Sequence, residues 1–206
     1  MGEANMNILH PAMTGRRLNF ASAGLSMTLA EFDAINDFEE GYRFELINGV
    51  VVVTPEPAPS HWSANDELGR LLRNYGEDHP QGSCLSGTVP EVYLLTSYAK
   101  RRADRALWIG LGRDPEPKHD TPAIVIEIVS PGREAFLRDF EKKRDEYLEL
   151  GCSEYWVIDK SDRTMTVFRR SVPCHIVKEN QVYSTPLLPG FELPLAKILR
   201  AADMYK

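Results

Sequence analysis

An apolar run covers residues 123–129 and is interrupted once, by Glu127. A continuous run of this kind bounded by prolines, here Pro122 and Pro131, is typical of a strand covered on both faces. A carboxylate in such a strand loses its hydration and needs a compensating partner. The pattern therefore predicts a buried strand whose glutamate contacts either a metal ion or a lysine.

Turn residues and apolar spacing predict the other elements. Asn48-Gly49 lies between two strand-like segments and is a strong signal for a tight hairpin. Helices are predicted where a capping box opens a segment or where apolar residues recur along one face. The predicted strands are 42–47, 50–54, 88–95, 103–109, 123–130, 154–159 and 164–170, and the predicted helices are 28–35, 60–75 and 134–150, followed by edge strands and a short final helix. This order indicates an α/β or α+β fold, with a mixed sheet covered by helices.

The predicted helix 134–150 directs one lysine toward its apolar side. At 100° per residue, Phe140, Lys143 and Tyr147 lie within about 60° of one another around the helix axis, whereas Lys142 points away. A cation on the buried face needs an internal partner. Because this helix follows the strand that carries Glu127, Lys143 is the predicted partner of that carboxylate.

Asp104 supplies a second carboxylate, on the predicted strand 103–109 and two residues after the basic stretch 100–102. If this strand neighbours that of Glu127, two carboxylates and Lys143 converge. Carboxylate oxygens suit Mg²⁺, which activates water while a lysine supports developing negative charge. Two other interpretations stay open: an aspartate flanked by arginine is usually solvated, and Glu127 with Lys143 can form a structural ion pair.

Composition limits the classes of protein that fit. Residues 1–24 have no periodic apolar pattern and are predicted to form a flexible leader. The length of 206 residues suits a single domain, predicted over 25–206. No apolar stretch is long enough for a membrane span, and three cysteines without a paired motif favour a reducing cytoplasm. The net charge of -6 argues against nonspecific coating of nucleic acid, but it is compatible with an acidic metal site and a local basic patch.

Several short segments form a recognisable series. In order they are Glu45-Leu46-Ile47-Asn48-Gly49, Ala103-Asp104, Glu127-Ile128-Val129-Ser130-Pro131, Asp139-Phe140-Glu141-Lys142-Lys143 with Tyr147, Glu154-Tyr155-Trp156 and Leu188-Pro189-Gly190-Phe191. Together they resemble the Uma-type restriction endonuclease family of the PD-(D/E)XK nuclease superfamily, over residues 28–199. The resemblance implies a restriction-endonuclease-like core, with a central mixed sheet flanked by helices and an N-terminal hairpin.

The resemblance also assigns roles. It implies that Asp104 and Glu127 bind the metal and act in catalysis, and that Glu45 completes the metal shell. Lys143 matches the catalytic lysine, carried here on the following helix, since Val129 occupies the position two after the glutamate. The proline expected before Asp104 is replaced by alanine, which removes no ligand. In the loop after the Glu127 strand, Gly132-Arg133 replaces a stretch usually rich in serine and threonine.

Two members of the set have ordinary alternatives. Glu45 can point to solvent, because side chains alternate along a half-exposed hairpin. His61, near the start of the predicted helix 60–75, matches a position where the family often has histidine, but a lone histidine is more often a cap or a surface residue. The other histidines and the cysteines lack the spacing of a zinc site.

The resemblance thus implies an endonuclease that uses Mg²⁺ or Mn²⁺ to hydrolyse DNA phosphodiester bonds, and the cysteine usage favours a cytoplasmic location. By analogy with nucleases of this architecture, a homodimer is expected, and no membrane partner. The alternative is a catalytically inactive nuclease-fold module, for binding or structure, in which Glu127 and Lys143 form a buried ion pair. No DNA-reading motif is present that would indicate a target sequence.

Overall fold

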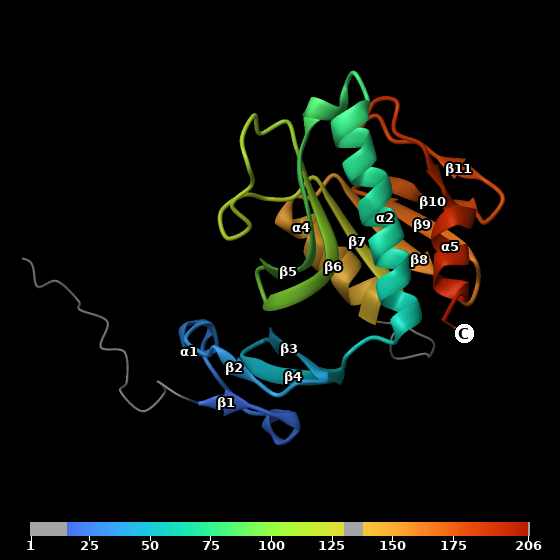
Figure 1. Ribbon diagram of the computed structural model, residues 1–206. Helices are drawn as coiled ribbons and strands as arrows, with labels where there is room; N and C mark the ends of the chain where they lie inside the picture. Colours follow the sequence, from blue (N-terminus) through green and yellow to red (C-terminus); the bar gives the residue numbers. More distant parts are fainter. Residues whose placement is uncertain (1–15, 130–137, 206) are drawn as a thin grey trace, which may run out of the picture. The chain divides into compact units, whose positions relative to one another are not determined.

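The computed structural model describes residues 16–129 and 138–205 (Figure 1). Contacts within the chain form two compact units, Met1–Glu56 and Pro57–Lys206. Most of the predicted leader, the Gly132-Arg133 loop and the first residues of the helix predicted from residue 134 lie outside the described residues.

The first unit contains a hairpin and a small parallel strand pair. The hairpin joins β3 (Tyr42–Ile47) to β4 (Val50–Pro55), and its turn residues Asn48 and Gly49 both have positive φ, as a tight two-residue turn requires. The helix α1 (Leu29–Asp33) begins with the predicted capping box. The other elements are β1 (Arg17–Leu18), the 3₁₀ turn η2 (Phe20–Ser22) and β2 (Asp37–Phe38), of which β1 and η2 fall inside the predicted leader.

The second unit contains the larger sheet and its helices. Its helices are α2 (Pro59–Asp78), the 3₁₀ turn η3 (Gly82–Cys84), the π-helical turn η4 (Arg138–Lys142), α4 (Lys143–Leu150) and α5 (Leu195–Asp203). Its strands are β5 (Leu85–Leu95), β6 (Ala99–Ile109), β7 (Ile124–Val129), β8 (Glu154–Asp159), β9 (Thr164–Arg169), β10 (Val172–Lys178), β11 (Val182–Tyr183) and β12 (Leu193–Pro194).

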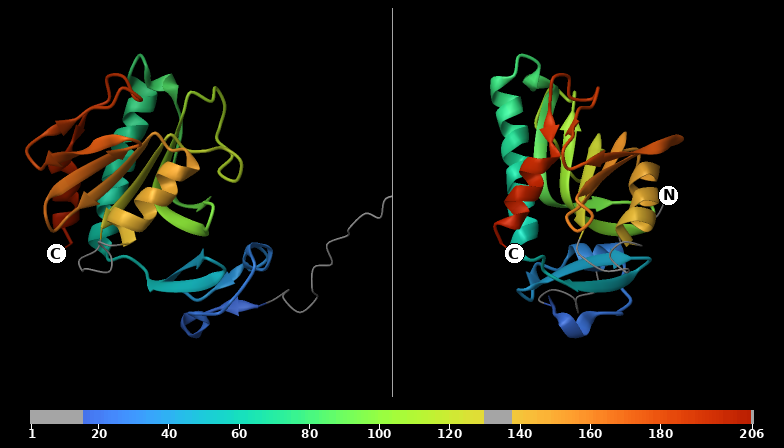
Figure 2. Two further views of the ribbon diagram at one scale, coloured as in Figure 1. Left: turned by 180° about the vertical axis from the view of Figure 1, so that it is seen from behind. Right: turned by 90° about the vertical axis from the view of Figure 1, so that its right-hand side faces the viewer.

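The sheet of the second unit is mixed. Neighbouring strands follow the order β10-β9-β8-β7-β6, and β5 pairs with β6. The pair β7 and β8 is parallel and is joined by a crossover that contains α4, whereas the other pairs in this order are antiparallel. Figures 1 and 2 show α2 and α5 side by side on one face of the sheet, with α4 on the opposite face.

Each face of this sheet has its own hydrophobic core. Isoleucines at even positions of β7 pack in a cluster that includes residues of α2 and α5. Val125 and Val129, at odd positions, belong to the other cluster, together with Tyr147 of α4. Glu127 has the odd parity, so its side chain belongs to the α4 face. The alternation of β7 therefore decides which helix its carboxylate meets.

The predicted fold class, a mixed α+β arrangement with helices on a central sheet and an N-terminal hairpin, is confirmed. Most predicted strand ends lie within a few residues of those in the structure. The strands β5 and β6 begin three and four residues earlier than predicted, respectively. The domain assignment stays a prediction. Among the described residues, no helix has both the length and the apolar composition that a membrane crossing requires.

Candidate functional site

Glu91 and Asp104 interrupt the regular pairing of β5 and β6. The ladder pairs the residues on both sides of them, so these two residues face each other across the strands. Glu91 has a φ of 51°, in the left-handed region that a non-glycine residue in a strand rarely adopts. Such strain is often found where a side chain must be aimed at a functional site.

The side-chain alternation of β6 changes phase at the same place. Arg101 bonds to Glu146 of α4, with a distance of 2.8 Å from its Nε to the carboxylate. Arg105 instead bonds to Asn65 of α2, on the other face of the sheet. Residues four apart in a regular strand point to the same face, so β6 twists irregularly around Asp104. At this irregularity the Asp104 carboxylate contacts both α2 and the backbone of β7.

The first turn of α2 brings His61 to this carboxylate. Nε2 of His61 lies 3.1 Å from Oδ1 of Asp104, and the side chains are 3% and 2% exposed. Neither ring nitrogen of His61 forms a well-oriented hydrogen bond with a described residue. A buried imidazole without hydrogen bonds is costly unless something binds its lone pair or its proton.

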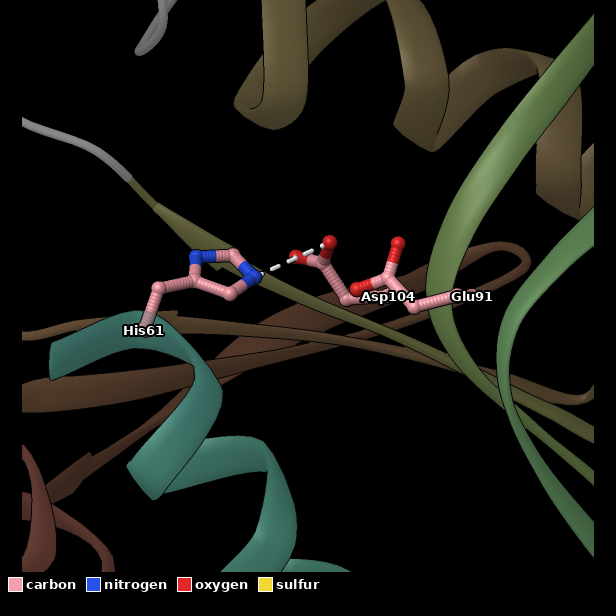
Figure 3. Close-up of side chains that lie close together, drawn as sticks. All are labelled: His61, Glu91 and Asp104. Atoms are coloured by element: carbon pink, nitrogen blue, oxygen red, sulfur yellow. Dashed lines mark ion pairs between the residues drawn. The ribbon is translucent and has the colours of Figure 1, made fainter. Parts of the chain in front are cut away.

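The three side chains form a cluster suited to a cation. One ligand atom from each of His61, Glu91 and Asp104 can be chosen so that all lie within 4.8 Å of one another. Figure 3 shows them pointing toward a common region from α2 and from the two strands. Carboxylates suit Mg²⁺ and Mn²⁺, and imidazole suits the transition metals, so this mixed donor set fits Mn²⁺ well. The unsatisfied His61 nitrogens are consistent with such a site.

The other oxygen of Asp104 links the cluster to β7. Oδ2 accepts a hydrogen bond of 2.7 Å from the backbone N–H of Ile128. The pairing between β6 and β7 covers only Arg105 to Leu107, so the two strands separate before Asp104 and its side chain takes up the next N–H of β7. Asp104 thus lies between His61 on one side and the residue after Glu127 on the other.

Glu127 is buried among charged and polar groups. Its Oε1 lies 2.9 Å from Nζ of Lys143 and accepts a hydrogen bond of 3.1 Å from the hydroxyl of Tyr147. Lys143 is also 3.5 Å from a carboxylate oxygen of Asp139. Burial raises the pKa of Glu127 well above its ordinary value, Lys143 opposes this, and the charges of Asp104 and Asp139 add to it. The contact between Glu127 and Lys143 is the one that helical phase predicted.

The π-helical turn before α4 positions these groups. Asp139 lies in this turn and Lys143 begins the α-helix, so the two residues are one turn apart. The hydroxyl of Tyr155 donates a hydrogen bond of 2.8 Å to the backbone carbonyl of Asp139 and ties the turn to β8. Single π turns are frequent at functional sites because they reorient side chains locally.

Asn65 supports Asp104 from the α2 side. Its Nδ2 donates to the backbone carbonyl of Asp104 at 2.8 Å, and its Oδ1 accepts from Nε of Arg105 at the same distance. Because Asn65 is one helical turn after His61, one face of α2 contacts both the side chain and the backbone of Asp104. This face fixes the relative position of the helix and the strand at the cluster.

Comparison with known protein families identifies the chain. The family Uma2, described as "Putative restriction endonuclease", matches residues 29–196. The chain belongs to the Uma2 family. The Uma-type resemblance recognised from the short motifs is therefore confirmed.

The fold of this chain is similar to that of a solved structure. It is the crystal structure of a putative nuclease belonging to DUF820 from Anabaena variabilis ATCC 29413. The two chains share 17% sequence identity with a TM-score of 0.70, covering 85% of this chain and 99% of the other. At this identity the similarity shows the shared fold alone. A comparison with curated proteins found no match.

Three of the four site residues predicted for this Uma2 chain lie in the second unit. There Asp104 bonds to the backbone next to Glu127, and Glu127 contacts Lys143. Glu45 is a buried residue of β3 in the first unit, and its part in a metal shell stays a prediction. The roles assigned to all four are likewise predictions.

Glu91 was missed by the sequence analysis, and His61 was not assigned to the site. Glu91 lies in an ordinary strand pattern after a proline, and its positive φ leaves no mark in the sequence. His61 had a weak signal, its match to a position where the family often has histidine. The distance of His61 to Asp104 could not be read from that match, because it depends on how α2 packs against β6.

Proposed function

We propose that this chain is an endonuclease that uses Mg²⁺ or Mn²⁺ to hydrolyse phosphodiester bonds in DNA. The observation that carries the proposal is the position of Asp104. One of its oxygens belongs to the cluster with buried His61 and partly buried Glu91, and the other bonds to the backbone beside Glu127. Membership of the Uma2 family, described as "Putative restriction endonuclease", supports nucleic acid as the substrate class.

The metal would be held around Asp104. His61 and Glu91 are the further donors that the geometry offers, and Glu127 and Glu45 are those implied by the family resemblance. A bound divalent ion supplies positive charge at the phosphate and makes water a better nucleophile. The chain's part is to fix the donors. Here the backbone N–H of Ile128 donates to the Asp104 carboxylate, and the side-chain amide of Asn65 donates to the Asp104 backbone carbonyl.

Lys143 would control the charge of Glu127. Burial raises the pKa of Glu127 and so disfavours its ionised form, whereas a nearby positive charge favours that form. Nζ of Lys143 supplies that charge at 2.9 Å and is held from the other side by Asp139. A cation in this position also stabilises negative charge that develops on a nearby phosphate.

Calorimetric titration with Mn²⁺ tests the metal site. The parent protein should give saturable heat, and His61→Ala and Asp104→Asn should each weaken binding more than tenfold. Asp114→Asn is the matched control, because Asp114 is exposed in the loop after β6 and should leave the affinity unchanged. Absence of saturable heat from the folded parent would contradict the proposed metal site.

Cleavage of supercoiled plasmid tests the activity itself. Nicked or linear product should appear with Mg²⁺ or Mn²⁺, disappear with EDTA, and be lost in Asp104→Asn and Glu127→Gln. Cleavage by these two variants at the parent rate would overturn the proposal, and so would a parent that binds metal but leaves DNA intact under all conditions.

One observation favours the second candidate, an inactive nuclease-fold module. Lys143 is buried between two carboxylates, an arrangement that also satisfies a purely structural ion pair. This candidate predicts that Glu127→Gln changes folding stability while leaving the heat of Mn²⁺ titration absent in both proteins. The endonuclease proposal predicts heat in the parent that is reduced in the variant.

A further inference from the structure

Lys160 lies beside the candidate site but belongs to none of the motifs described above. It follows directly after β8, whose last residue, Asp159, pairs with the last residue of β7, Val129. The carboxyl ends of the parallel strands β7 and β8 therefore lie next to each other, and Lys160 extends beyond that end. Ligands of open sheets commonly bind at the carboxyl ends of parallel strands.

The side chain of Lys160 reaches the first turn of α2. Its Nζ donates a hydrogen bond of 3.1 Å to Oγ of Ser60, the residue before His61. The turn that carries Lys160 is fixed by Asp159, whose Oδ1 accepts hydrogen bonds from the backbone N–H groups of the next two residues after Lys160. A defined backbone and a defined contact thus place this ammonium group next to the cluster.

The charge of Lys160 is only partly compensated. Lys160 is half-buried, and among residues 16–129 and 138–205 no carboxylate lies within ion-pair distance of it. Burial lowers its pKa, and the charges of Asp104 and Asp159 oppose this, which places both carboxylates within electrostatic range. An ammonium has three hydrogen-bond donors, and a single neutral hydroxyl uses one of them.

The start of α2 adds to the positive potential here. The N-cap residue of this 20-residue helix is alanine, whose side chain cannot accept a hydrogen bond from the first turn. The N-terminus of a helix carries a partial positive charge that favours anions. In the same turn, His61 is buried with ring nitrogens that lack hydrogen-bond partners among the described residues.

From these positions we propose that Lys160 is a phosphate-binding residue of the site, which donates to a non-bridging oxygen of the DNA phosphate. The inference rests on the proposed function for its substrate and adds a second lysine with a separate task. Lys143 is enclosed by Glu127 and Asp139, whereas Lys160 has donors left for a substrate. A lysine used in this way acts as a point charge on the phosphate.

Fluorescence anisotropy with a labelled DNA duplex tests the inference without cleavage, if Ca²⁺ replaces Mg²⁺ and the salt concentration is varied from about 50 to about 200 mM. Lys160→Met keeps the apolar stem and removes a half-buried charge, so the fold should be retained, and Lys160→Gln is a second neutral variant. Both should raise Kd about tenfold. Both should also reduce the slope of log K against log salt by about 1.

Three controls separate phosphate binding from a structural role. Lys118→Gln removes an exposed lysine in the loop before β7, at the opposite end of the parallel strands, and should bind DNA like the parent. Lys160→Arg should retain the salt slope. Ser60→Ala removes the internal contact of Lys160 and should leave binding largely intact, because the substrate phosphate is the partner that matters.

The outcomes decide between the two proposals. Unchanged Kd and slope in both neutral variants would overturn the inference, and so would a loss in Ser60→Ala equal to that in Lys160→Met. If the parent cleaves DNA in Mn²⁺ while these variants bind normally, only the role of Lys160 fails. If the parent never cleaves, yet DNA binding depends on Lys160, the endonuclease proposal fails and the phosphate contact stands.

Discussion

Replacing Lys143 by methionine should strongly destabilise the second unit. Its Nζ lies 2.9 Å from Glu127 and 3.5 Å from Asp139, and both carboxylate side chains are at most 3% exposed. Removing one partner of a buried ion pair leaves an uncompensated charge and typically costs about 3–5 kcal/mol. With a urea dependence of about 2 kcal/mol per M, the unfolding midpoint should fall by roughly 2 M.

Tryptophan fluorescence during urea titration measures this loss. Trp108 and Trp156 are fully buried in the two cores of the second unit, so their emission reports on its packing. Lys142→Met is the matched control, because Lys142 is exposed and adjacent in sequence. Its substitution should change the free energy of unfolding by less than about 0.5 kcal/mol.

The cost should also depend on pH, in a direction set by Glu127. Lys143 is the group that lowers the pKa of this carboxyl, so the variant has a folded-state pKa even further above the unfolded value. A raised folded-state pKa contributes stability that is present below the unfolded pKa and is lost as pH rises through the folded pKa. The loss of stability in Lys143→Met should therefore be larger at pH 8 than at about pH 5.

A double-mutant cycle completes the test. Glu127→Gln combined with Lys143→Met removes both charges, so the double variant should be more stable than the sum of single losses indicates, by about 0.5–3 kcal/mol. Additive losses, or a loss in Lys143→Met no greater than that in Lys142→Met, would refute the buried pair as the source of the stability.

Two further predictions concern packing and thiol reactivity. Gly69→Ala should destabilise the protein by about 1–3 kcal/mol, because the added Cβ would lie 2.6 Å from the hydrogen-bonded guanidinium of Arg105. Gly76→Ala in the same helix adds a Cβ that meets nothing closer than 3.8 Å, so it should stabilise the protein by up to about 1 kcal/mol. Thermal unfolding of the two variants compares these effects. Burial raises the pKa of Cys152 to about 12, so iodoacetamide at pH 8 should label exposed Cys174 and leave Cys152 unmodified in the folded protein. Peptide mass spectrometry measures the labelling of each cysteine, and equal labelling would contradict the burial of Cys152.

The strand that carries Glu127 and the helix phase that turns Lys143 toward it were predictable from sequence. Both follow from short-range periodicity, which depends only on the local backbone geometry. Asp104 could be placed on a strand, and the family motif supplied its partner. Its bond to the N–H of Ile128 was beyond sequence reasoning, because it arises where two strands separate.

Glu91 and His61 show where local patterns end. The φ of Glu91 is positive although its sequence context is that of an ordinary strand, since the tertiary structure holds the residue there. The approach of His61 to Asp104 depends on the contact of Asn65 with the strand, across 39 residues of sequence. Contacts of this range are decided by packing, which a single sequence does not display.

The same long separations bear on when during folding the cluster comes into being. Asp104 is held by Asn65 across 39 positions and by Ile128 across 24, while β5 and β6 form a local hairpin. Loops of that length close late, after local hairpins and helices have formed. We therefore expect the folding transition state to lack the ion-binding cluster. Mn²⁺ should then slow unfolding and leave the refolding rate unchanged, so that it protects the folded protein kinetically.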